Sequence, residues 1–318
     1  MGGDGIELDV IVDAHHHLWD HSTRPYRIAE LRCDAASVPD VCCSVFVECR
    51  SAYRSLGPEV LRPIGETEYV VASDPDGFVA GIVGFADLLS PEVTDVLDGH
   101  IEAGGGRFRG IRYGCASDPS AAIRDFYTRP APGVLGDPEL RRGVAAIGAA
   151  GLIFETFVFH PQLPELVDVC RALPDVLVVF DHLGGPLGIG PYEHRRDEVS
   201  AAWRSSMSAL AACDNVRLKL GGVGMAIHGT HWRNDARAGV GQIVERWREP
   251  VRWCIEEFGP DRCMFESNFP VDKASFGYAD LWAAFRAITE DASATDREAL
   301  FAGTAIRTYR LDDAIVSS

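Results

Sequence analysis

Two histidines near the start of the chain have the spacing of metal ligands. His15 and His17 come shortly after the apolar run 10–12, with Asp13 and Ala14 in between. In extended backbone, residues two positions apart point to the same side, so this pair shares one side while His16 faces elsewhere. Two imidazoles on one side suit a divalent cation such as Zn²⁺. Histidine pairs also occur on ordinary protein surfaces, so the interpretation depends on what else the fold brings near them.

Further polar side chains stand where apolar runs of the sequence end. His160 comes after the run 152–159, and His182 comes after the run 176–180. In an α/β barrel the catalytic groups gather at the carboxyl ends of the strands. We therefore take both histidines as candidate metal ligands, and His182 also as a candidate catalytic group. The other polar residues in comparable places are Glu48, Arg112, Lys219, Asn268 and Asp272.

A structural role stays open for each of these residues. His160 precedes a proline at an expected helix start, where a capping role is the alternative. His182 has the alternative of a hydrogen-bonded core histidine. Ion pairs are the alternative for Glu48, with Arg50 or Arg112, and for a buried Lys219. The remaining histidines considered are expected to be structural or exposed: His16, His21, His100 and His194.

Eight short apolar runs, rich in β-branched residues, alternate with longer amphipathic segments. The runs are 10–12, 42–47, 79–85, 108–113, 152–159, 176–180, 216–220 and 263–265. Continuous apolar runs are typical of strands buried on both faces, as in a parallel sheet. Helical spacing recurs between them, for example at Leu163, Leu166 and Cys170, and a final helix is expected at about 295–309.

Eight strand–helix units predict a closed (β/α)8 TIM-like barrel in a single domain. The competing open, doubly wound sheet lacks the Gly-x-Gly-x-x-Gly turn that would follow its first strand. The barrel is expected at 10–311, with a flexible N-terminal segment at 1–9 and a C-terminal tail at 312–318. Two long connections, 114–137 and 221–240, follow predicted strands, where loops often form lids.

The composition excludes several classes of partner. The chain has 318 residues, with 47 acidic and 30 basic side chains and a formal net charge of −17. This charge argues against nucleic acid and anionic membranes, although a few arginines in a cleft would still hold a small anion. The longest apolar runs are far shorter than the roughly 20 residues of a membrane helix. Nine cysteines without a Cys-x-x-Cys pair, and no signal peptide, predict a cytoplasmic protein with reduced thiols.

The chain resembles the amidohydrolase superfamily, in the amidohydrolase 2 branch that holds 2-pyrone-4,6-dicarboxylate lactonase and sugar-acid lactonases. The resemblance extends over nearly the whole chain. It is carried by the segments 12–19, 110–113, 159–166, 181–186, 219–222, 263–272 and 303–305. It implies a TIM-like barrel, a first-strand ligand pair at His15 and His17, and site histidines after strands five and six that match His160 and His182.

The same resemblance implies an acid after strand eight that acts as the general base. This chain departs from the family there, because the usual Ser-Asp-Trp-Pro reads Ser267-Asn268-Phe269-Pro270. Asparagine cannot take up a proton at neutral pH. Three replacements stay open: Asp272, Glu48, or a metal-activated water that needs no separate strong base.

The function predicted from the sequence is metal-assisted hydrolysis of a small carboxylated lactone, or of a similarly activated ester or amide. The divalent metal, most simply Zn²⁺, is assigned to His15, His17, His160 and His182. Arg112 is expected to hold a substrate carboxylate in a bidentate fork, assisted by Arg50, Arg54 or Arg129. Trp19, Tyr113 and Lys219 complete the expected substrate site. Because the resemblance includes lactonases that work without metal, a metal-free reaction stays open.

Two other functions stay open at this stage. The first is a metal-dependent, non-oxidative decarboxylase of an aromatic or unsaturated acid, which needs the same ligands and the same arginine. The second is an inactive barrel that serves as a binding protein, an alternative motivated by Asn268. The sequence does not determine the substrate, the metal, or whether identical chains assemble into an oligomer.

Overall fold

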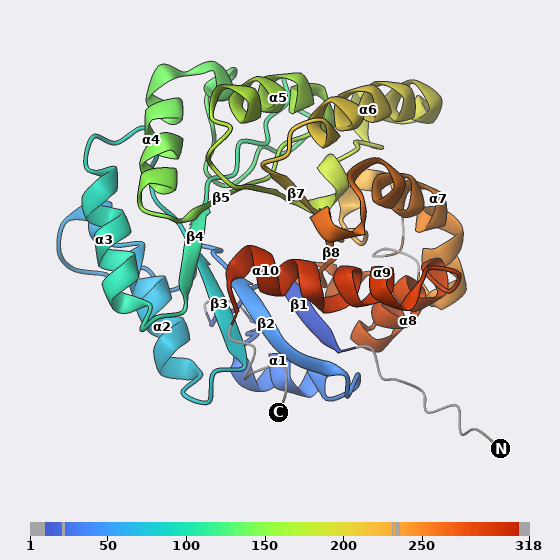
Figure 1. The fold of residues 1–318 in the computed structure, drawn as a ribbon, viewed down its shortest axis with the longest axis horizontal. Coiled ribbons are helices and arrows are strands. Elements are labelled where there is room, and N and C mark those ends of the chain that lie inside the picture. Colours follow the sequence, from blue (N-terminus) through green and yellow to red (C-terminus); the bar gives the residue numbers. More distant parts are fainter. Residues whose placement is uncertain (1–9, 21–22, 231, 233–235, 312–318) are drawn as a thin grey trace.

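Eight parallel strands follow one another around a barrel in the computed structural model of the chain (Figure 1). The structure describes residues 10–20, 23–230, 232 and 236–311. The strands are β1 Ile11–His16, β2 Val41–Val47, β3 Val79–Gly84, β4 Phe108–Arg112, β5 Ile153–Thr156, β6 Val178–Phe180, β7 Val216–Leu220 and β8 Cys263–Phe265. The predicted segments 1–9 and 312–318, and His21, lie outside the described residues.

Backbone hydrogen bonds just beyond the strand ends join the last strand to the first. The Asn268 amide donates to the His15 carbonyl at 2.9 Å, and the His17 amide donates to the Phe269 carbonyl at 2.8 Å. These two bonds continue the sheet across the gap between β8 and β1. The predicted (β/α)8 barrel is confirmed, and the closure holds the first-strand histidines against the residues that follow β8.

Helices connect the strands and form the outer ring of the barrel (Figure 1). They are α1 Ile28–Ala35, α2 Ile64–Ser73, α3 Val93–Ala103, α4 Pro138–Ala149, α5 Leu163–Ala172, α6 Arg196–Ala211, α7 Val240–Phe258, α8 Tyr278–Ile288, α9 Ala294–Glu298 and α10 Thr304–Tyr309. A π-helical turn, Ala299–Gly303, joins α9 to α10, so the helix expected at about 295–309 is one nearly continuous helical segment. No helix in the described part of the chain is long and apolar enough to span a membrane.

Two strand boundaries differ from the prediction in ways that matter for the site. The first strand extends to His16, because its polar residues are fully buried in the barrel rather than exposed in a loop. The fifth strand ends at Thr156, three residues before the expected end. The segment 157–159 has left the sheet there and packs with residues of the loops that follow β4 and β6.

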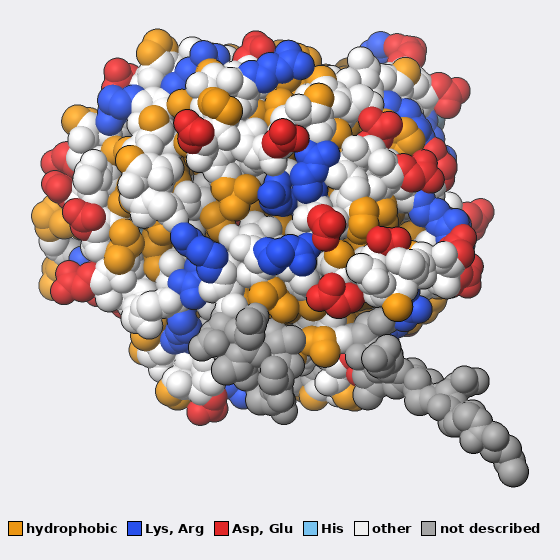
Figure 2. Space-filling model, viewed as in Figure 1, with side chains coloured by type: hydrophobic (Ala, Val, Ile, Leu, Met, Phe, Trp, Pro, Cys, Tyr) orange, Lys and Arg blue, Asp and Glu red, His pale blue; other side chains and the backbone are white. Residues whose placement is uncertain are grey.

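The C-terminal helix closes the end of the barrel at which the strands begin. Figure 1 shows α10 crossing this end, and the Thr304 hydroxyl donates to the Pro260 carbonyl just before β8. The Tyr309 side chain reaches the barrel interior, where its hydroxyl donates to Glu155 at 2.7 Å. Acidic and basic side chains are interspersed over the face seen in Figure 2, so the net negative charge is not gathered there.

Candidate active site

A cavity of about 500 Å³ opens at the carboxyl ends of the strands. Five predicted site residues line it: His17, Trp19, Arg112, His182 and Asn268. Its other lining residues are Thr23, Arg24, Cys49, Phe126, Tyr127, Phe157, Met225 and Val271. Phe126 and Tyr127 come from the long connection 114–137, and Met225 comes from the connection 221–240. Both loops therefore contribute to the cavity wall, as expected of loops at this end of a barrel.

His15 and His17 meet at the end of β1 with their Nε2 atoms 3.2 Å apart. Nδ1 of His17 donates to the Val47 carbonyl at 2.7 Å, so the lone pair of this ring is on Nε2. Burial lowers the pKa of both histidines well below the ordinary value. Both rings are therefore neutral, which is the form that binds metal. His16 points away from them and lies against Phe46, with ring centroids 5.9 Å apart.

Asp181, at the end of β6, is a buried carboxylate whose two oxygens form no hydrogen bond with the described residues. It lies 3.6 Å from Nδ1 of His15 and 3.5 Å from Nζ of Lys219. One ligand atom from each of His15, Asp181 and His182 falls within 4.8 Å of the others. A buried carboxylate without hydrogen bonds is costly unless a cation compensates it. Two imidazoles and one carboxylate form a donor set that fits a zinc-like divalent cation.

The side chains around Asp181 include more acids than bases, which favours a bound cation. Four buried carboxylates, Glu48, Glu155, Asp181 and Glu266, face only two buried cationic side chains, Arg112 and Lys219. If all four carboxylates are ionised and the histidines are neutral, two negative charges have no counterion in this cluster. Burial, and then the nearby Asp181 carboxylate, raise the pKa of Glu155 to about 8. A bound divalent cation would neutralise two negative charges of the cluster, so that Glu155 could stay ionised.

His182 pairs with an acid that follows β8. Its Nδ1 donates to Oε1 of Glu266 at 2.6 Å, and its ring lies against Phe157 with centroids 5.2 Å apart. Burial alone would lower the pKa of His182, but the Glu266 carboxylate outweighs it and raises that pKa. Nε2 makes no hydrogen bond with the described residues, and His182 lines the cavity. The Glu266 contact therefore fixes the ring with Nε2 available for a proton or a metal ion.

Arg112 is held from inside the protein by Glu48 and Tyr127. Its Nε donates to Oε1 of Glu48 at 2.9 Å, and its Nη2 donates to the Tyr127 hydroxyl at 2.9 Å and to the Glu48 carbonyl. The ion pair proposed as the alternative role of Glu48 is thus present. The opposite end, Nη1, lies 3.6 Å from Asp181. Arg112 lines the cavity, but most of its donors are already engaged, so the bidentate grip expected from the sequence has few donors left.

Lys219 is buried beneath the cavity instead of lining it. Its Nζ donates to Glu155 at 2.6 Å and to Nδ1 of His15 at 3.2 Å. The ring of Tyr309 lies 5.4 Å from the same nitrogen. Burial alone would lower the pKa of Lys219, but the surrounding carboxylates, Glu155 first, raise it. The structure therefore places Lys219 in the buried ion pair that was its alternative role, next to a metal-binding candidate.

The structure does not bring His160 together with the other histidines. Its Nδ1 accepts a hydrogen bond from the Leu187 amide at 3.3 Å, and its ring lies 4.9 Å from that of Tyr192. It is absent from the group of ligand atoms found among the described residues. Burial lowers its pKa to about 4. The helical turn that begins at His160 carries the side chain toward the loop after β6, away from the barrel axis.

The carboxylate of Asp272, the first candidate for the missing base, is already engaged in hydrogen bonds. Its carboxylate accepts from the Gly224 amide at 2.8 Å and from Nδ2 of Asn268 at 3.2 Å. It is fully buried and does not line the cavity. Asp272 therefore joins the loops after β7 and β8 and orients Asn268, whose side chain does reach the cavity wall.

The remaining predicted residues lie around the site or apart from it. Trp19 stacks near His17 with ring centroids 6.4 Å apart, in the cavity wall. Tyr113 stacks on Phe85, outside the cavity lining. Arg50 donates to the Tyr127 carbonyl at 3.0 Å and so supports the loop behind Arg112. Arg54 pairs with Glu68, and Arg129 is absent from the cavity lining.

Sequence reasoning missed three acids of the cluster. Asp181 and Glu266 each stand directly beside a recognised motif, before His182 and before Ser267. Glu155 is a charged residue inside an otherwise apolar strand. In a barrel, a charge in such a strand points into a polar interior layer or requires a buried partner. That signal could have indicated Glu155 as a partner for Lys219.

Comparisons with known proteins agree with the barrel fold. The model of the amidohydrolase family matches residues 12–311. The chain is 31% identical to a protein of Sinorhizobium fredii over 95% of this chain and 98% of that one. It is 27% identical to an L-fucono-1,5-lactonase of Burkholderia multivorans, over 95% of this chain and 96% of the relative. A solved amidohydrolase of Burkholderia multivorans with bound zinc superposes with a TM-score of 0.76 at 25% identity, over 95% and 100% of the two chains.

Proposed function

This chain belongs to the amidohydrolase family and is a hydrolase, and we propose that it opens the ester ring of a small carboxylated lactone. One observation carries the proposal: one ligand atom from each of His15, Asp181 and His182 lies within 4.8 Å of the others, next to a cavity of about 500 Å³ that His182 lines. The naming of two similar proteins as L-fucono-1,5-lactonases supports a lactone as the substrate class.

The donor set of His15, Asp181 and His182 fits a divalent cation, and the zinc-bound structural relative supports zinc as its identity. When bound, such an ion polarises a carbonyl oxygen and lowers the pKa of water. Glu266 holds the ring of His182 and thereby fixes the tautomer of this donor. Lys219 and Arg112 counter part of the negative charge, so the cluster is not left with four unopposed carboxylates.

His182 serves hydrolysis in two ways that use the same nitrogen. With metal bound, Nε2 is the donor that faces the cavity. In a metal-free reaction, Nε2 accepts the proton of the attacking water, and the Glu266 carboxylate stabilises the resulting imidazolium. The raised pKa of His182 makes this nitrogen a better base than an isolated histidine. Activity after removal of metal distinguishes the two roles.

The cavity wall matches a small ring with an anionic group. Trp19, Phe126 and Phe157 provide flat apolar surfaces, and Arg24 adds a second guanidinium group to the wall beside that of Arg112. An arginine in the wall can bind an anionic group of a substrate even in a chain of net charge −17. Asn268 replaces the family's usual aspartate and removes one negative charge from the wall, which also favours a carboxylate.

The test is a ring-opening assay with two lactones of different charge. L-fucono-1,5-lactone is the neutral candidate, and a pyrone dicarboxylate is the anionic one. Acid release is followed with a pH indicator, and carbon dioxide is measured in parallel to detect decarboxylation. We expect acid release without carbon dioxide, with the anionic lactone preferred, and its loss in Asp181→Asn. Carbon dioxide release from an unsaturated or aromatic acid, with no lactone opened, would replace the proposal by the decarboxylase reaction.

A further inference from the structure

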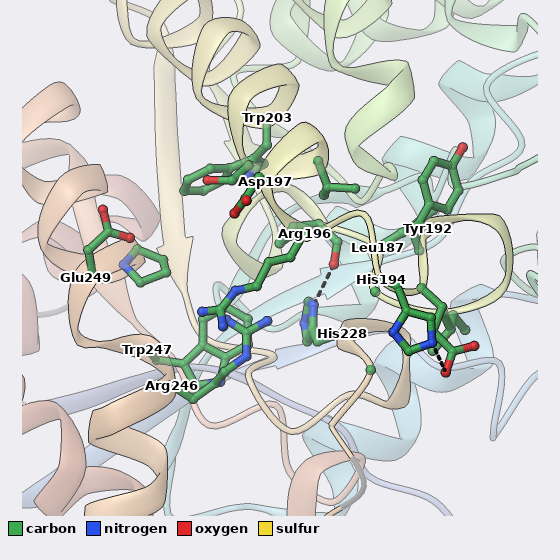
Figure 3. Close-up of a pocket in the computed structure, with 18 residues that line it drawn as sticks. Leu187, Tyr192, His194, Arg196, Asp197, Trp203, His228, Arg246, Trp247 and Glu249 are labelled. Atoms are coloured by element: carbon green, nitrogen blue, oxygen red, sulfur yellow. Dashed lines mark hydrogen bonds and ion pairs between the residues drawn. The ribbon is translucent and has the colours of Figure 1, made fainter.

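A second, larger cavity of about 700 Å³ lies between α6 and α7 (Figure 3). None of its lining residues is shared with the cavity at the strand ends. Its walls are the start of α6, the middle of α7 and the connections that follow β6 and β7. The residues used below are Arg196, Asp197 and Trp203 from α6, and Arg246, Trp247 and Pro250 from α7.

Two arginines converge in this cavity, and neither has an acidic partner among the residues that the structure describes. Figure 3 shows the side chains of Arg196 and Arg246 extending toward one another. Neither guanidinium forms an ion pair or a side-chain hydrogen bond with the described residues. Burial, and then the charge of Arg196, lower the pKa of Arg246 to about 10. Two like charges side by side, one of them half-buried, are unfavourable unless an anion joins them.

The acids in the wall do not neutralise this pair. Glu249 is bound to Arg204 on the outer surface of α6. Glu193 lies 3.7 Å from the exposed His194. Asp197 lines the cavity but forms no ion pair with either guanidinium group among the described residues. In the described part of the chain, no acidic side chain of the wall therefore pairs with either guanidinium group.

The walls beside the arginines are aromatic and apolar. The Arg246 guanidinium lies over the ring of Trp247, 4.7 Å from its centroid. Pro250 stands inside α7 and has no amide hydrogen, so the Arg246 carbonyl one turn earlier loses its helical donor. Trp203 adds a second indole, whose Nε1 donates to the Leu183 carbonyl at 2.7 Å. The cavity wall thus contains two guanidinium groups and two indole rings.

We propose that the cavity between α6 and α7 is a second ligand site, which binds a small organic oxyanion with an apolar ring. The two guanidinium groups receive the oxyanion, since planar forks match carboxylate and phosphate oxygens. The ring of the ligand lies against Trp247 and Trp203. The site is separate from the catalytic cavity and does not depend on the reaction proposed for it.

Binding is tested on the full chain by isothermal titration calorimetry and tryptophan fluorescence. Benzoate and phenyl phosphate are the probes, and benzyl alcohol is the neutral control. Benzoate binding alone assigns a carboxylate site, and tighter phenyl phosphate binding assigns a phosphate ester site. The variants are Arg246→Met and Arg196→Met, with Arg248→Met as the matched control, because Arg248 is on the same helix but pairs with Glu290.

We expect one oxyanion probe to bind and benzyl alcohol not to bind. Either cavity variant should weaken binding at least about tenfold, since each removes a charge-assisted contact, while Arg248→Met binds as the wild type does. Without ligand, Arg246→Met should melt no lower than the wild type, because it removes a half-buried charge that has no acidic partner among the described residues. Absence of binding by both probes, or equal binding by the double variant Arg196→Met/Arg246→Met, would overturn the proposal.

Discussion

Replacing Asp181 by asparagine tests the central interpretation of the active site. The change keeps the shape of the side chain and removes one negative charge from the buried cluster. The carboxylate lies 3.5 Å from Nζ of Lys219 and 3.6 Å from Nη1 of Arg112. At an effective dielectric constant of 20, each attraction is worth roughly 4–5 kcal/mol. Desolvation and repulsion from Glu155 oppose these attractions by several kcal/mol.

Stability and activity should therefore respond differently to Asp181→Asn. Because the opposing terms nearly cancel, we expect the free energy of unfolding of the metal-free protein to change by less than about 2 kcal/mol. Loss of a charged metal ligand should lower the metal content well below one ion per chain and lower kcat/KM by about 10²–10³-fold. A purely structural carboxylate would produce the opposite pattern, with a lower melting temperature and unchanged metal content.

The assay is metal analysis by mass spectrometry on protein purified without added metal or chelator, alongside lactone turnover and thermal melting. His15→Ala/His17→Ala serves as the positive control for loss of metal. Asp168→Asn, an exposed aspartate on α5, is the matched control for the chemical change. Full metal occupancy with near-normal turnover in Asp181→Asn would refute the reasoning.

Three further outcomes are expected. Burial depresses the pKa of His160 to about 4, so its contribution to stability is present above its unfolded pKa of about 6.5 and is lost as pH falls from there toward 4. Denaturant titrations at several pH values measure the free energy of unfolding over this window. Between pH 6.5 and 4, the His160→Gln variant should lose up to about 3 kcal/mol less of it than the wild type loses. Tyr127→Phe removes a hydroxyl bonded to Arg112 and should lower kcat/KM about tenfold with a small change in melting temperature, whereas an unchanged rate would exclude a role for this loop. Tyr309→Phe leaves an oxygen of Glu155 without its donor and should cost about 1–3 kcal/mol in urea denaturation, and an unaltered midpoint would show that the contact is not needed.

The fold and the first-strand histidines could be predicted because both depend on local sequence patterns. Apolar runs specify strands buried on both faces, and eight of them specify closure. The alternation of side chains along a strand places His15 and His17 together, and the structure has their Nε2 atoms 3.2 Å apart. His182 comes two residues after the end of its strand and also lines the cavity.

The rest of the site depends on geometry that sequence spacing does not carry. His160 follows β5 after three residues that have already left the sheet, so its direction is set by the loop. Asp272 appeared available as a base, but the amide of Gly224, 48 residues away in the chain, occupies its carboxylate. The roles of Asp181 and Glu266 follow from a charge balance among six side chains of six different strands and loops. Such a balance is visible only once the chain has folded.

The position of Tyr309 has a consequence for how the protein is made. This residue lies near the end of the chain, yet its hydroxyl completes the hydrogen bonding of Glu155, next to Lys219 and the first-strand histidines. During synthesis the N-terminal parts of a chain emerge and begin to fold first. The charges in the polar interior of this barrel therefore stay incompletely paired until the segment that carries Tyr309 has left the ribosome. A chain truncated before α10 would lack both this contact and the cover over the starts of the strands.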